Sequence, residues 1–160
     1  MTETLSREEV EQRVAILKRY RKLLEEQRNA FREYLNVLEK QEESIEAEST
    51  EIIVAQAELE HKIVASLSSL HRVTLPLEKL YSEQFSTEDE AIPELKTDLE
   101  NLKQAVLEQN QKNRDLLKTK MGDIRNQIKT LNNPSFNPYA KKASIYSQNN
   151  ATASILDVEL

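Results

Sequence analysis

Few residues of this 160-residue chain have the types and spacing that chemistry requires. Its two histidines, His61 and His71, are ten residues apart in a segment that we expect to be helical. Ten helical residues rotate by about 1000°, roughly 80° short of whole turns, so the two rings diverge and do not share a metal. The chain has no cysteine and one glycine, Gly122, so it offers neither a thiolate nor a glycine-rich phosphate loop.

Acidic residues are the remaining candidates for catalysis, because a carboxyl group can act as a general acid or base. They lie in solvated charge runs such as Glu42-Glu43 and Glu88-Asp89-Glu90. General acid–base catalysis needs a concave and partly dry pocket to shift the pKa of such a group, and a slender helical bundle offers little of one. We therefore expect no enzyme, no metal site and no cofactor.

The elements that hold these residues are predicted by an apolar repeat. A seven-residue interval keeps one narrow line of side chains facing a partner helix, whereas a strand would alternate at period two. The line consists of Val10, Leu17, Leu24, Phe31, Leu38, Ile45, Ile52 and Leu59. The pattern predicts long helices, with Tyr20, Phe31 and Tyr34 packed in their core.

Local start and stop signals divide the chain into helices. Ser6 precedes Glu8 and Glu9, a combination of N-cap hydroxyl and first-turn acids that starts a helix. Residues 46–50 are polar or small and end in the N-cap pair Ser49-Thr50, which predicts a tight reversal there.

Prolines mark the second half of the chain. Pro76 falls inside the apolar pattern Leu59, Ile63, Leu67, Leu70, Val73, Leu77 and Leu80, and predicts a kink or an early helix end. Pro93 suits the first turn of a third helix, and Asn132-Asn133-Pro134 ends it.

We therefore predict an all-α fold, an elongated antiparallel three-helix bundle or coiled coil over residues 1–131. The helices are expected at about 6–46, 50–84 and 91–131. Residues 132–160 are expected to form a disordered tail, since they cannot bury enough surface to order themselves. The tail ends in Ile155-Leu156-Asp157-Val158-Glu159-Leu160, which is either a short recognition segment or inert.

Charge and hydropathy limit the partners and the location. The net charge is −6, with acids and bases interleaved, so neither nucleic acid nor an anionic membrane is an expected partner. No apolar run is long enough for a signal peptide or a membrane span. We expect a soluble, cytoplasmic protein without membrane insertion.

The apolar stripe of the third helix is interrupted. It runs to Val106 and resumes at Leu117, with Gln109, Asn110 and Asn113 between them. Either these polar residues fix the register of packed helices, or this face is uncovered and awaits another helix. The sequence leaves both interpretations open.

One octet in this gap resembles a known signature. Asn110-Gln-Lys-Asn113-Arg-Asp-Leu116-Leu117 is similar to the N-x-x-N-x-x-L-L motif of the FlgN family, the flagellar export chaperones for hook–filament junction proteins. The segments Ala57–Val64 and Leu75–Glu78 also resemble the middle of some members. The layout of about 130 helical residues followed by a tail containing a tyrosine is similar too.

The resemblance implies a mechanism of client protection in bacterial flagellum biogenesis. Members bind the amphipathic terminal helices of FlgK-like and FlgL-like junction proteins, prevent premature assembly and deliver them for type III secretion. Binding uses the C-terminal part of the helical region, which here corresponds to Leu116, Leu117, Met121, Ile124, Ile128 and Leu131.

The resemblance also implies docking to the export gate. Members use a tail tyrosine to contact the FlhA-like gate subunit, and the export ATPase complex is a further partner. Tyr146 is the first candidate because small, turn-forming residues follow it, and Tyr139 is the second. The glycine that often follows this tyrosine in the family is missing here.

A protein of a different class explains the heptads equally well. A self-assembling structural coiled coil without a client would be a stable homodimer with a saturated third helix. A rod-like component of the export apparatus is a third hypothesis.

Overall fold

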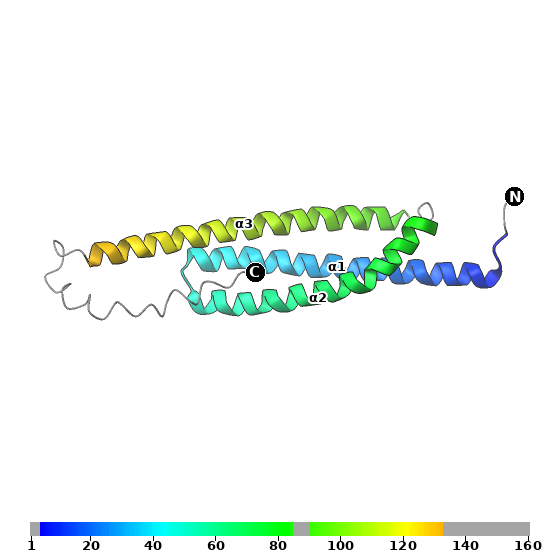
Figure 1. The fold of residues 1–160 in the computed structure, drawn as a ribbon, viewed down its shortest axis with the longest axis horizontal. Coiled ribbons are helices and arrows are strands. Elements are labelled where there is room, and N and C mark those ends of the chain that lie inside the picture. Colours follow the sequence, from blue (N-terminus) through cyan, green and yellow to red (C-terminus); the bar gives the residue numbers. More distant parts are fainter. Residues whose placement is uncertain (1–3, 85–89, 133–160) are drawn as a thin grey trace. The chain divides into compact units, whose positions relative to one another are not determined.

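The computed structural model describes residues 4–84 and 90–132. It consists of the helices α1 (Arg7–Glu46), α2 (Thr50–Gln84) and α3 (Ala91–Leu131), and no strand occurs in the described part (Figure 1). The predicted all-α class with three packed helices is confirmed. The observed helix ends match the predicted ones, except that α1 begins at Arg7 with Ser6 as its cap. The predicted tail after Asn132 lies outside the described residues.

The chain divides into two compact units, Met1–Leu116 and Leu117–Leu160, and the boundary falls inside α3. The first unit contains α1, α2 and the part of α3 up to Leu116. The predicted division at residue 131, into a helical bundle and a tail, stays a prediction. The described part of the second unit is the end of α3, from Leu117 to Leu131, together with Asn132.

The start of α1 is fixed by a reciprocal capping pair. The Ser6 hydroxyl accepts a hydrogen bond from the Glu9 backbone N–H at 3.3 Å, and the Ser6 N–H donates to Glu9 Oε2 at 2.8 Å. Two N–H groups that the first helical turn leaves without partners are satisfied in this way. The cap also lowers the pKa of the Glu9 carboxyl, chiefly through the bond from the Ser6 backbone.

The reversal between α1 and α2 occupies Ala47, Glu48 and Ser49, as predicted. The Ala47 N–H still bonds the Glu43 carbonyl at 3.0 Å, and Glu48 then takes a positive φ of 55°. The Ser49 N–H bonds the Ser44 carbonyl at 3.0 Å and closes the turn. In consequence α2 runs antiparallel to α1, and these two helices approach each other with Cα atoms within 8 Å (Figure 1).

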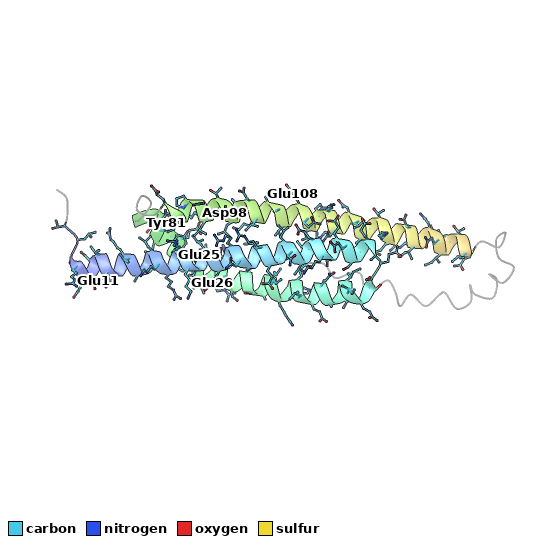
Figure 2. All side chains as sticks on the ribbon, turned by 180° about the vertical axis from the view of Figure 1, so that it is seen from behind. Glu11, Glu25, Glu26, Tyr81, Asp98 and Glu108 are labelled. Carbon is cyan, nitrogen blue, oxygen red and sulfur yellow. The ribbon has the colours of Figure 1, made fainter. Side chains whose placement is uncertain are left out.

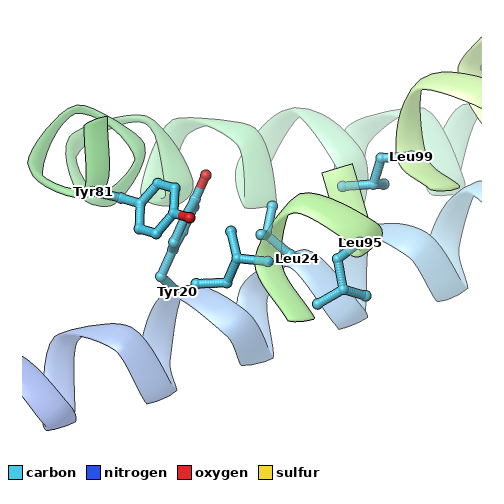
Figure 3. Packing of buried hydrophobic residues seen from close by; sticks show 6 residues of the cluster. Tyr20, Leu24, Tyr81, Leu95 and Leu99 are labelled. Carbon is cyan, nitrogen blue, oxygen red and sulfur yellow. The ribbon is translucent and has the colours of Figure 1, made fainter. Parts of the chain in front are cut away.

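Two apolar clusters hold the first unit together. In the first, Tyr20 and Leu24 of α1 pack with Tyr81 of α2 and with Leu95 and Leu99 of α3 (Figure 3). The Tyr20 and Tyr81 rings lie 5.3 Å apart between centroids at a tilt of 42°. The second cluster consists of Tyr34, Val37, Leu38, Ile63 and Val106. Phe31 packs against both clusters, so the predicted aromatic core is present.

Pro76 does not end α2. The helix continues through the proline to Gln84, so of the two predicted outcomes the early helix end is wrong. The ribbon of α2 changes direction in its last turns (Figure 1), as expected where a proline removes one backbone hydrogen bond. The bent end carries Tyr81 into the first cluster, so the helix beyond the proline is anchored by packing.

Candidate protein-binding site

Asn113, from the signature octet, is buried in the bundle with 3% of its surface exposed. Its Nδ2 group donates to the Leu38 carbonyl of α1 at 2.8 Å and to Gln41 Oε1 at 3.2 Å. A buried amide needs such partners, because an unsatisfied polar group costs stability. Asn113 therefore fixes α3 against one level of α1.

Glu42 of α1 holds the neighbouring turn of α3. Gln109 Nε2 donates to Glu42 Oε2 at 2.5 Å and to Asn113 Oδ1 at 3.0 Å. Lys112 Nζ lies 2.7 Å from Glu42 Oε1. The hydrogen bond from Lys112, followed by that from Gln109, lowers the pKa of the Glu42 carboxyl. The hydrogen bond to Glu42 in turn raises the pKa of the Lys112 amine.

The polar interruption of the α3 stripe is thus a contact with α1. Of the two open interpretations, register fixing agrees with the geometry, and an uncovered face at Gln109 and Asn113 does not. Asn110 and Leu116, the other signature residues of the first unit, are partly exposed.

Beyond Leu116 the apolar residues of α3 are open to solvent. We name Leu117, Met121, Ile124, Ile128 and Leu131 the α3 apolar stripe. Their spacing of four, three, four and three residues places them on one helix face. Leu117 and Met121 are partly exposed, whereas Ile124, Ile128 and Leu131 are 43%, 51% and 65% exposed. At Gly122 an added Cβ would have no neighbour within 4 Å, so among the described residues nothing packs closely against this glycine.

Two buried polar bonds between α1 and α2 were not predicted. The Tyr34 hydroxyl donates to Glu60 Oε1 at 2.8 Å, with Glu60 only 1% exposed, and Gln27 Nε2 donates to Thr74 Oγ1 at 2.9 Å. Our predicted α2 stripe contained Leu59 and Val73. The structure instead buries the adjacent residues Glu60 and Thr74, and leaves Leu59 and Val73 exposed. In the sequence, the only indication of this choice was that a polar residue directly follows each of the two apolar ones, Glu60 after Leu59 and Thr74 after Val73.

The remaining candidate residues divide into exposed and undescribed ones. His61 and His71 are both exposed, and within residues 4–84 and 90–132 no group of three or more acidic, histidine or cysteine side chains is arranged to hold a metal ion. Figure 2 shows the side chains of the helices, where labelled acids such as Glu11, Glu26 and Glu108 are exposed. Among the described helices none is sufficiently long and apolar to cross a bilayer. Tyr139, Tyr146 and the last six residues lie outside the described part.

Fold and surface together define an all-α protein whose last helix presents an apolar face. No known family profile matches the sequence, and no solved structure matches it. A protein of Treponema pallidum (strain Nichols), described as uncharacterized, is 39% identical over 124 residues, which cover 78% of this chain and 80% of that protein. The chain belongs to the same family as this Treponema protein.

Proposed function

We propose that the protein is a cytoplasmic flagellar type III export chaperone of the FlgN kind. In this proposal it binds the amphipathic terminal helices of hook–filament junction proteins, prevents their premature assembly and delivers them to an FlhA-like gate subunit and the export ATPase complex. The supporting observation is the α3 apolar stripe, in which Ile124, Ile128 and Leu131 are exposed.

The stripe has the geometry that an amphipathic partner helix needs. Its five apolar residues recur at intervals of three and four over four turns of α3. Such anchors interlock with an equivalent row on a second helix and exclude water from both. Burial of a half-exposed leucine or isoleucine side chain is worth roughly 1 kcal/mol, so the five residues of the stripe contribute about 5 kcal/mol. Micromolar binding corresponds to about 8 kcal/mol and therefore also needs the burial of the client's own apolar row.

The experiment is a binding titration with the terminal segments of a junction protein. Leu117→Glu together with Ile124→Glu should weaken binding at least tenfold, since two anchors are lost and two charges are brought into an apolar contact. Leu107→Glu is the matched control, because Leu107 is an exposed leucine of α3 outside the stripe. Circular dichroism should show the same helix content for all variants.

Equal affinity of the double variant and the wild type for the client would overturn the proposal. Hydrogen exchange gives an independent measurement, since client binding should slow exchange in residues 114–131. If exchange there is unaffected by any junction protein, the structural coiled coil without a client becomes the better account.

A further inference from the structure

The part of α3 that carries the α3 apolar stripe is also positively charged. Residues 117–131 contain four bases and one acid, Asp123, so their net charge is +3 in a chain whose net charge is −6. The bases are Lys118, Lys120, Arg125 and Lys129. Lys118, Arg125 and Lys129 are exposed and lie about 100° of helix rotation to one side of the stripe. An occupant that suits this face is therefore both apolar and acidic.

The helix dipole accounts for only part of this charge. Bases are favourable in the last turn of a helix, and Lys129 lies there. Lys118 and Arg125 lie thirteen and six residues before Leu131, where the dipole has little effect. Their position beside the stripe instead suits contact with a negatively charged partner.

One segment of the chain has the matching composition. Residues 155–160, which we name the acidic segment, contain four apolar residues, and the other two are Asp157 and Glu159. These two are the only acids that follow Asp123 in the sequence. The acidic segment and the α3 apolar stripe both belong to the second unit, so contact between them does not depend on how the two units are placed.

The other apolar residues of the tail suit the basic face less well. Those between positions 136 and 146 surround Lys141 and Lys142 and have no acid within ten residues. Like charges repel each other, so these lysines disfavour contact with the bases of α3. Composition therefore favours the acidic segment.

The connecting chain has a suitable length. Residues 133–154 number 22, and a random coil of that length has a root-mean-square span of roughly 25 Å. The stripe is about 21 Å long, and six extended residues reach roughly 20 Å. A tether whose span matches the distance to its site raises the local concentration of the attached group to about a millimolar. A contact of about millimolar affinity, too weak to join separate molecules, is then formed about half of the time.

We infer that the acidic segment binds the α3 apolar stripe of its own chain when no partner occupies the stripe. Its apolar side chains contribute the attraction, and its two acids select this face, since exposed charges contribute more to selectivity than to affinity. The contact protects the exposed stripe from non-specific association. A contact within one chain needs no client, so the inference does not rest on the proposed function. The acidic segment includes neither Tyr139 nor Tyr146.

A nitroxide spin label at Ser154→Cys tests the contact in the full-length chain, because the natural chain has no cysteine. The label should broaden the nuclear magnetic resonance signals of the amide groups in residues 117–131. A tethered label broadens these signals partly without any contact, so the baseline is the same labelled chain with Leu156→Ser, Val158→Ser and Leu160→Ser. Loss of three apolar side chains removes the attraction, and the broadening should fall by about twofold or more.

The matched control combines the label with Phe136→Ser and Ile145→Ser, which remove apolar side chains of the tail outside the acidic segment. It should show the same broadening as the labelled chain without further substitutions. Equal broadening in that chain and in the triple-serine variant would overturn the inference. So would full broadening in a mixture where the label and the observed amides are on different chains, since the segment would then bind a second copy.

Charge reversal tests the selection of the basic face. Asp157→Lys with Glu159→Lys should reduce the broadening by about twofold at low ionic strength. Lys118→Glu with Arg125→Glu in the same chain should restore it, because opposite charges then face each other again.

The control for the reversal is Glu33→Lys with Glu39→Lys, which changes the net charge equally at two exposed positions of α1. It should leave the broadening unchanged. A reversal in the acidic segment without effect, or one that the compensating pair on α3 does not restore, would overturn the assignment of the segment to this face.

Discussion

The hydroxyl groups of two buried tyrosines in α1 differ in their surroundings. The Tyr34 hydroxyl donates to Glu60, whereas the Tyr20 hydroxyl is buried and has no hydrogen-bond partner among the described residues. Burial raises the pKa of both phenols, and at Tyr34 the bond to Glu60 raises it further. Both groups therefore remain neutral at physiological pH, but only Tyr34 satisfies a buried partner.

We predict opposite outcomes for Tyr34→Phe and Tyr20→Phe. Tyr34→Phe removes the hydrogen bond of the buried Glu60 carboxyl group and should cost about 2–4 kcal/mol in the free energy of unfolding. Tyr20→Phe keeps the ring that packs on Tyr81 and removes an unpaired buried hydroxyl, so it should be neutral or stabilising by about 1 kcal/mol. Urea denaturation measures both, and equal losses for the two variants would contradict the assignment.

These two tyrosines also show which buried residues could be predicted from the sequence. Aromatic side chains on the apolar side of a predicted helix were expected in the core, and Tyr20 and Tyr34 are buried. The burial of Glu60 was not predicted, because the apolar neighbour Leu59 fits the same repeat. The choice between adjacent residues depends on whether α1 offers a hydrogen-bond donor at that level. Tyr34 does so from 26 positions earlier in the chain.

Among the elements, the turn between α1 and α2 contains the clearest local strain. Glu48 has a φ of 55°, in the left-handed region where a Cβ atom crowds the following carbonyl oxygen. Glycine adopts this conformation without that cost and is the usual residue after a helix end. The turn is short because Ser49 bonds back to Ser44.

We predict that Glu48→Gly stabilises the first unit by about 0.5–1 kcal/mol. Glycine relieves the backbone strain at the positive φ, and this gain is reduced by the greater conformational entropy of the unfolded chain. The control is Glu39→Gly, at an exposed position inside α1, which should destabilise by about 1 kcal/mol. Thermal or chemical denaturation of the two variants gives the comparison. Destabilisation by both substitutions would show that the turn is not strained.

Helix limits were predictable because their signals are local, such as the pairing of Ser6 with Glu9 and the polar turn before Thr50. The contacts of the polar segment of α3 were not predictable, because its hydrogen-bond partners come from a distant part of the chain. Asn113 bonds the Leu38 carbonyl across 75 residues, and Gln109 bonds Glu42 across 67. A pattern within one helix cannot specify which of these contacts forms.

On the scale of the whole molecule, α3 belongs to both units, and its apolar residues differ in burial between the two. Leu95, Leu99 and Val106 of α3 are buried in the bundle, whereas Ile124, Ile128 and Leu131 are exposed. The sequence shows an apolar stripe of the same spacing in both parts. Periodicity identifies the face of a helix but not whether something covers it, so the division at Leu116 could only come from the structure. The fold itself does not define a function, and the exposed stripe is what supports one.

If the chaperone proposal holds, the tail is expected to contact the export gate separately from the client. A single exposed aromatic residue often contributes 2 kcal/mol or more to such a contact, because its large rigid surface enters a pocket on the partner. Tyr146→Ala should therefore weaken binding to the cytoplasmic domain of the gate subunit roughly thirtyfold, without changing affinity for junction-protein segments. Tyr139→Ala tests the second candidate position in parallel, and it should leave gate binding unchanged if Tyr146 is the docking residue.

Calorimetric titration of the wild type and both variants against each partner measures the two affinities separately. Loss of gate binding by Tyr139→Ala alone would reassign the docking residue. Equal gate affinity for all three proteins would remove both tyrosines from the mechanism. A simultaneous loss of client binding in Tyr146→Ala would contradict the expectation that the tail and the α3 apolar stripe act on different partners.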